Sequence, residues 1–104
     1  MSPVQAAVIP VTDGALDYAK SVAQALRSRG LRVELDERNE TMQAKIRDAQ
    51  LQKIPYMVVL GGREAQAGTM AIRHRRQGDL GPMTLEQFAE RMKQETDDRT
   101  ADSN

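Results

Sequence analysis

Two alternating periods of apolar residues run along this chain, and they predict a succession of strands and helices. The first strand is expected from Val4 to Val11 (VQAAVIPV), with Pro10 near its end, where a missing backbone donor does least harm. A helix should follow, because apolar residues then recur at spacings of three and four: Leu16, Ala19, Val22, Ala23 and Leu26. Thr12 or Asp13 is suited to cap its start, and Gly30 to end it.

The next pattern is a second strand, a second helix and a third strand. Leu31 to Leu35 alternates apolar and polar residues, as a strand with one buried face does. A helical stripe after Asn39 consists of Met42, Ile46 and Ala49, with Lys45, Arg47 and Gln52 off that stripe. Pro55 should stop this helix at the residue before it. Tyr56 to Leu60 (YMVVL) is typical of a central strand covered on both faces.

The remainder of the chain predicts a strand, a helix and a tail. Residues 63–68 form a polar connection, with room for a short strand, and Thr69 to His74 alternates like a strand that has Arg73 on its polar face. Gly78, Gly81 and Pro82 break the chain. A capping box, Thr84 and Gln87, then starts a helix whose apolar face comprises Leu85, Phe88, Ala89 and Met92. Residues 1–95 are expected to form one domain, and residues 96–104 a disordered polar tail.

This order predicts an α/β layer fold with a mixed sheet between helices. In such sheets, sites gather at the carboxyl ends of the parallel strands. The loop 36–40 follows the second strand and residues 61–64 follow the third. These two segments should therefore meet at one edge of the sheet.

Composition narrows the classes of function. The absence of cysteine excludes disulfides and thiolate metal sites, and a single histidine, His74, leaves little for a zinc site or a catalytic pair. None of the common catalytic motifs is present, so no catalytic or metal-binding residue is assigned. Without an apolar run of membrane length or a signal peptide, we expect a cytoplasmic protein that contacts no membrane.

The charge is balanced overall but unevenly distributed. Lys and Arg together number 15, as do Asp and Glu. Residues 38–78 contain eight basic and three acidic side chains, a net charge of +5, whereas residues 79–104 carry −4. A neutral chain polarised in this way is able to hold a phosphate backbone, with a modest salt dependence.

The side chains of the basic segment suit the reading of unpaired bases. A carboxylate such as Glu64 accepts hydrogen bonds from guanine N1–H and N2–H, whereas an arginine fork such as Arg73 donates to base carbonyls. Bases are read in this way in single-stranded RNA loops. Plainer interpretations stay open: the run Arg73 to Arg76 also suits a solvated strand edge, and Asn39 suits a helix N-cap.

The run from Leu35 to Met83 closely resembles the C-terminal anticodon-binding domain of bacterial-type threonyl-tRNA synthetases, which are class IIa enzymes. The motifs that carry the resemblance are R-N-E at 38–40, I-P-Y-M at 54–57 and R-x-R-R-x-x-D-L-G at 73–81. It extends over about residues 3–95. The resemblance implies a five-stranded mixed sheet flanked by three helices, and binding to the anticodon loop of threonine tRNA.

The resemblance also implies roles for particular residues. Asn39, Glu64 and Arg73 match the positions that read the second and third anticodon bases. Backbone contacts are assigned to Arg38, Lys45, Arg75 and Arg76. The family implies no cofactor in this domain, because ATP, Mg and Zn belong to other domains of the parent enzyme. The expected partners are threonine tRNA and the parent catalytic domain, with no DNA.

Some positions depart from the family pattern. Thr41 and Gln43 stand where the family usually has lysine and glycine, and Gln77-Gly78 replaces glycine-lysine, so two positive charges are lost. These losses leave a second hypothesis, a free-standing paralogue that acts as a protein-interaction or regulatory module. A small α/β enzyme is the third and least supported class. Met1-Ser2 directly before the family's proline favours a fragment of a synthetase over a free-standing protein.

Overall fold

A five-stranded mixed sheet forms the centre of the molecule, as expected. The computed structural model describes residues 4–37 and 40–102, with side chains described as far as residue 94. The strands lie in the order β2-β1-β3-β4-β5. Their bounds are β1 Ala6–Pro10, β2 Val33–Leu35, β3 Tyr56–Leu60, β4 Met70–His74 and β5 Gly78–Met83. The first three strands are parallel to one another, whereas β4 and β5 are antiparallel to their neighbours.

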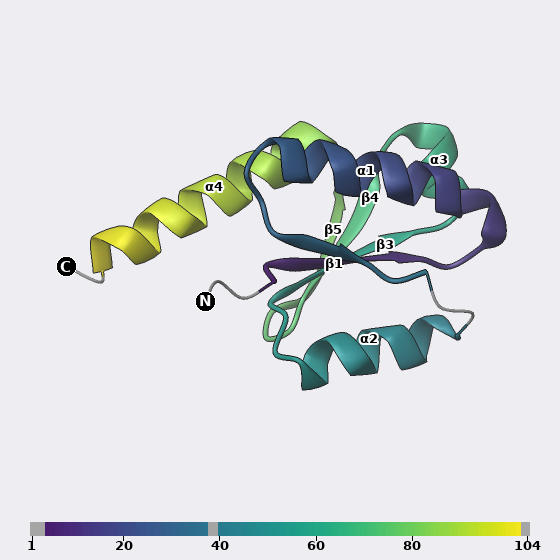
Figure 1. Cartoon of the computed structure of the whole chain (residues 1–104), viewed down its shortest axis with the longest axis horizontal. Coiled ribbons are helices and arrows are strands. Elements are labelled where there is room, and N and C mark those ends of the chain that lie inside the picture. Colours follow the sequence, from purple (N-terminus) through teal and green to yellow (C-terminus); the bar gives the residue numbers. More distant parts are fainter. Residues whose placement is uncertain (1–3, 38–39, 103–104) are drawn as a thin grey trace.

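Helices cover the two faces of the sheet unequally. They are α1 Leu16–Ser28, preceded by the 3-10 turn η1 Asp13–Ala15, α2 Met42–Leu51, α3 Gly62–Ala67 and α4 Leu85–Asp102. Figure 1 shows α1 and α4 on one face and α2 on the other. The larger core lies on the α1/α4 face, with Leu26, Tyr56 and Phe88 fully buried. The smaller core lies under α2, where Ala49 packs with Ile9 and Met57.

The α2 face of the sheet is open over β4 and β5. The smaller core contains no residue of these two strands. Ala71 is partly exposed, and Arg73 and Pro82 are exposed. We call this region, comprising Ala71, Arg73, Asp79 and Pro82, the open face.

Local sequence accounts for the ends of the helices. Gly30, with φ of 86°, ends α1: its N–H donates to Arg27 O at 3.0 Å, and the N–H of Leu31 donates to Leu26 O at 3.1 Å. These two hydrogen bonds together form the Schellman motif. The predicted capping box starts α4, since Thr84 N–H donates to Gln87 Oε1 at 3.0 Å and Gln87 N–H donates to Thr84 Oγ1 at 3.2 Å.

The structure corrects several predicted elements. Residues 63–68 are not a polar connection or strand but belong to α3, so four helices rather than three accompany the sheet. Gly78, Gly81 and Pro82 were predicted to break the chain, but they lie within the fifth strand, β5. The backbone of α4 continues to Asp102, into the stretch where the sequence predicted a disordered tail. Neither Gly nor Pro interrupts that stretch, so nothing in it stops a helix.

β5 is an irregular edge strand. Ile72 pairs with Gly81 and Arg73 with Asp79, so Leu80 is an extra residue in β5. Leu80 packs against the larger core. Gly81 has φ of 86°, a conformation that suits glycine, and its N–H donates to Asp79 Oδ1 at 2.8 Å. This bulge allows a strand rich in glycine to keep one apolar anchor in the core.

Candidate nucleic-acid interface

Arg73 lies on the open face. In β4 it pairs with Met57, which belongs to the smaller core. Residues directly opposite each other in a sheet share a face, so the Arg73 side chain lies on the same side as α2. It is exposed, and within the described residues its guanidinium makes no hydrogen bond or ion pair. No described residue therefore occupies its donors.

Glu64 lies at the carboxyl edge of the sheet, at the start of α3. Its Oε1 accepts a hydrogen bond of 2.7 Å from the N–H of Gly61, the N-cap of α3. Glycine has no side chain to return a bond, so this is one half of a capping box. A Cβ at position 61 would lie 3.0 Å from this oxygen and 3.2 Å from a methyl group of Val11, so glycine fits the position. One carboxylate oxygen is thus committed to the fold, and Oε2 has no recorded partner among the described residues.

Tyr18 connects α1 to this edge of the sheet. Its hydroxyl donates to the carbonyl oxygen of Thr69 at 3.0 Å. Burial, and secondly the negative charge of Glu64, raises the pKa of the Tyr18 hydroxyl above its ordinary value of 10.0. The hydroxyl therefore stays protonated and keeps donating this hydrogen bond well into the alkaline range.

The structure does not bring Glu64 and Arg73 to one point. Gly61, to which Glu64 is bonded, is four positions along the chain from Met57, the partner of Arg73. At about 3.3 Å per residue, the two positions are about 13 Å apart along the strand.

The third predicted reading residue, Asn39, lies outside the described residues, as does Arg38. The loop is fixed on both sides of them. Asp36 N–H donates to Val8 O at 2.9 Å, and Thr41 Oγ1 accepts from Ala44 N–H at 3.1 Å. Thr41 is therefore the N-cap of α2, which removes the plainer interpretation of Asn39 as that cap.

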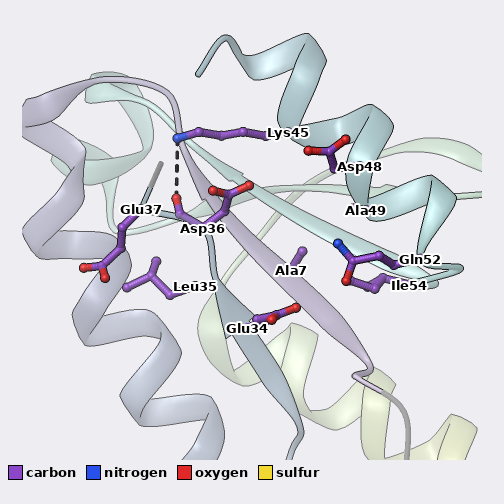
Figure 2. A pocket seen from close by; sticks show the side chains of 10 residues that line it. All are labelled: Ala7, Glu34, Leu35, Asp36, Glu37, Lys45, Asp48, Ala49, Gln52 and Ile54. Atoms are coloured by element: carbon purple, nitrogen blue, oxygen red, sulfur yellow. Dashed lines mark hydrogen bonds between the residues drawn. The ribbon is translucent and has the colours of Figure 1, made fainter. Parts of the chain in front are cut away.

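Lys45 is buried, contrary to its expected position off the apolar stripe of α2. Its side chain is 5% exposed, whereas Met42 from the expected stripe is 39% exposed. The Lys45 ammonium donates to the carbonyl oxygen of Pro10 at 3.2 Å. It also donates to the carbonyl oxygen of Asp36 at 3.4 Å, the bond drawn in Figure 2. These bonds use two of the three N–H groups, and the residue is buried, so a phosphate contact from Lys45 would require its side chain to leave this position. The sequence missed this because a lysine stem can lie in a core while its charged end finds polar partners.

The cavity beside Lys45 is acidic. It has a volume of about 300 Å³ between α2 and the β2 side of the sheet, and Figure 2 shows its carboxylate side chains: Glu34, Asp36, Glu37 and Asp48. A second cavity of about 430 Å³ at the carboxyl edge includes Asp13, Glu37 and Glu40. Within the described residues, no group of three side chains is arranged to hold a metal ion. Carboxylates repel phosphate, so these two cavities are not themselves sites for an RNA phosphate.

The β4–β5 hairpin presents the opposite charge. Arg75 is partly used by the fold: its N–H donates to Pro55 O at 2.9 Å, and its Nη1 donates to Lys53 O at 3.2 Å. Arg76 is exposed, and within the described residues its side chain makes no hydrogen bond or ion pair. Of the two arginines assigned to backbone contacts here, Arg76 is the freer.

Two side chains that the sequence analysis did not assign hold this hairpin in place. His74 Nδ1 accepts from the N–H groups of Arg76 at 3.1 Å and Gln77 at 3.2 Å, and its ring contacts Tyr56 edge-on at 4.9 Å. Arg91 of α4 donates to Tyr56 Oη and Gln77 Oε1, both at 3.3 Å. The even spacing of His74 from Met70 and Ile72 does place it on the core face, but no sequence signal pointed to Arg91.

The structure thus combines one exposed arginine on the open face of an α/β sheet with two exposed arginines in the adjoining hairpin turn. Residues 5–95 match the family described as anticodon binding domain, and the chain belongs to that family. This region is a binding domain and carries no ligase chemistry of its own. Membership of the family confirms the resemblance inferred from the sequence motifs, and it implies that the chain binds tRNA.

Relatives at the sequence level are threonine–tRNA ligases. The ligase of Clostridium botulinum (strain Hall) is 48% identical over 100 residues, which cover 96% of this chain and 16% of the relative. The ligase of Syntrophomonas wolfei is 48% identical over 99 residues, which cover 95% of this chain and 16% of that protein. The chain thus spans about a sixth of the length of these relatives.

Solved structures share the fold. The RNA-binding domain of threonyl-tRNA synthetase from Cryptosporidium parvum Iowa II superimposes with a TM-score of 0.85 at 34% identity, covering 89% of this chain and 24% of that one. Histidyl-tRNA synthetase from Nostoc sp. PCC 7120 gives a TM-score of 0.84 at 25% identity, covering 91% of this chain and 23% of that one. Among the described residues, no helix is both long and apolar enough to cross a bilayer.

Proposed function

We propose that this chain reads the second and third anticodon bases of threonine tRNA as part of a threonyl-tRNA synthetase. The observation that carries the proposal is the position of Arg73, exposed on the open face with no partner among the described residues. A guanidinium left free in this way donates to the carbonyl groups of unpaired guanine or uracil. The names of the relatives support the ligase context over a regulatory module.

Glu64 is the proposed acceptor for the middle guanine. Its Oε2 remains for a ligand while Oε1 caps α3, so the carboxylate is oriented before RNA binds. Such fixed orientation lowers the entropy cost of binding. Asn39 is proposed as the third reading residue, since Thr41 and not Asn39 caps α2. Backbone contacts are proposed for Arg38, Arg75 and Arg76, with Lys45 requiring release from its buried position.

The remaining parts of the proposal concern the parent enzyme. The catalytic domain would be a second partner, with ATP, Mg and Zn bound outside this domain, so base reading here needs no cofactor. The setting would be the cytoplasm, and DNA is not expected as a ligand. Affinity is expected to be moderate, because two family cations are missing at positions 41 and 78.

Binding to an anticodon stem-loop tests the proposal. The chain is titrated at fixed low salt with the threonine-tRNA stem-loop and with the same loop carrying adenine in place of the middle guanine. We expect tighter binding to the guanine loop, because adenine offers no N1–H donor to a carboxylate. Equal affinity for the two loops would leave only backbone attraction and would refute base reading.

A further inference from the structure

The residue that ends α2 has an unusual backbone conformation. Lys53 has φ of 62°, and it is the one non-glycine residue with positive φ in the part of the chain that the structure describes. Its N–H donates to Gln50 O at 3.0 Å, and Ile54 N–H donates to Ala49 O at 3.0 Å. This is the same Schellman motif that ends α1, where Gly30 occupies the equivalent position. Lysine is thus present at a position with left-handed backbone angles, where its Cβ causes a steric cost that glycine would avoid.

The fold supplies no reason for a lysine at this position. Its exposed ammonium makes no hydrogen bond or ion pair within the described residues. A cation at a helix C-terminus does favour the helix dipole, but the Arg75 guanidinium already donates to the Lys53 carbonyl at 3.2 Å. Residues held in sparsely populated backbone conformations tend to cluster at functional sites, which makes the side chain the feature to explain.

Lys53 lies at the corner where α2 meets the hairpin. Its carbonyl is joined to Arg75, and the N–H of Arg75 is bonded to Pro55, so the hairpin and the segment between α2 and β3 lie side by side (Figure 1). This corner borders the face of the sheet on which Arg73 is exposed. Lys53 and Arg76 are the cations of this corner that have no side-chain partner among the described residues, and the acidic cavity lies on the β2 side of α2.

We propose that Lys53 is a phosphate-binding residue which, together with Arg76, holds the RNA backbone beside the base-reading Arg73. This inference rests on the proposed function and adds a contact to the same interface. A lysine ammonium suits the ligand, because it acts as a mobile point charge toward a phosphodiester and carries no base preference. The Schellman turn fixes the position of the Lys53 Cα, and the flexible side chain can adjust to the position of an RNA phosphate.

Charge-removing variants test the inference. K53Q and K53G are compared with K53R and with K93Q, which removes one exposed lysine from α4 on the opposite face. Glycine suits the backbone at position 53, so K53G keeps the fold. At low salt we expect K53Q and K53G to weaken stem-loop binding on the order of fivefold, and to reduce the salt slope by about 0.7. K53R and K93Q should bind like the unaltered chain.

The loop with adenine in place of the middle guanine separates this inference from the proposed function. A phosphate contact predicts the same fold-loss in K53Q for both loops. A loss confined to the guanine loop, or unchanged binding in both K53Q and K53G, would overturn the role of Lys53 while base reading stands. Equal binding of the two loops by the unaltered chain would overturn base reading, yet a loss in K53Q would still support the phosphate contact.

Discussion

Lys45 Nζ lies 3.2 Å from the carbonyl oxygen of Pro10, so a lysine of α2 closes the carboxyl end of β1. The same ammonium bonds Asp36 O at the start of the loop that carries Arg38 and Asn39. The buried charge therefore joins the strand edge to the loop proposed to read a base. Both acceptors are backbone carbonyls. Substitutions of the Pro10 or Asp36 side chains therefore leave the acceptors in place, whereas a substitution of Lys45 removes the donor.

Replacing Lys45 by methionine keeps an unbranched apolar stem, one atom shorter, and removes the donor. We expect K45M to lower the free energy of unfolding by about 1–3 kcal/mol, because the buried Pro10 carbonyl loses its lysine donor. Urea denaturation measures the change. The matched control is K20M, at an exposed lysine whose pair with Glu37 spans 3.8 Å, where we expect a change below about 1 kcal/mol. Equal stability of the two variants would show that the Lys45 contacts contribute nothing.

Arg73 should determine base preference without affecting the fold. R73A is expected to lose about 1–3 kcal/mol of discrimination between the guanine and adenine loops. R73K should not restore it, since an ammonium cannot reproduce the planar fork of a guanidinium. R29A, at an exposed arginine at the end of α1, is the matched control for charge. If R73A discriminates as well as R29A does, Arg73 is not a reading residue.

Glu64 combines a role in the fold with a proposed role in binding, and two substitutions separate them. Glutamine at N3 also accepts from the N-cap N–H, so E64Q should retain stability, whereas E64A should lose about 0.5–2 kcal/mol. Glutamine, however, has a single acceptor oxygen, which the cap uses. E64Q should therefore fold normally and lose preference for guanine. Thermal unfolding combined with the two-loop titration checks this, and an E64Q variant with full preference would contradict the assignment.

Tyr18 predicts a loss of stability in alkaline solution. Its folded-state pKa is raised by burial and by Glu64, so the unfolded chain loses the phenolic proton first as pH rises. The stabilising contribution is complete below the unfolded pKa of about 10 and disappears as pH passes through the folded pKa. Urea midpoints between about pH 9 and pH 11 should fall more steeply for the unaltered chain than for Y18F. Parallel curves would show that the Tyr18–Thr69 contact has no linkage to pH.

Sequence patterns predicted most of the fold and the elements that carry the site. The parallel strands, the end of α1 at Gly30 and the capping box of α4 follow from periodicity and turn chemistry. α3 was missed because it has six residues and none of them is buried, so it has no apolar stripe. β5 was missed because Gly78, Gly81 and Pro82 are poor strand residues, and pairing with β4 overrides that preference.

Positions of the site residues depended on information that sequence does not contain. Alternation placed Arg73 on the polar face of β4, but it could not show that α2 stops short of that strand. The helical period placed Lys45 with the polar residues of α2, although its stem is buried and its end is bonded to two carbonyls. The strain at Lys53 depends on a backbone angle that no residue pattern shows.

The irregularity of β5 has a consequence for how copies of this chain meet. β5 is one outer strand of the sheet, and it carries the bulge at Leu80, an exposed Asp79, and Pro82, which has no N–H to offer. The other outer strand, β2, is three residues long. Short, bulged and proline-containing edges discourage edge-to-edge pairing and aggregation. A domain protected in this way resists fibre-like self-association at high concentration, which leaves the neighbouring surface free for its ligand.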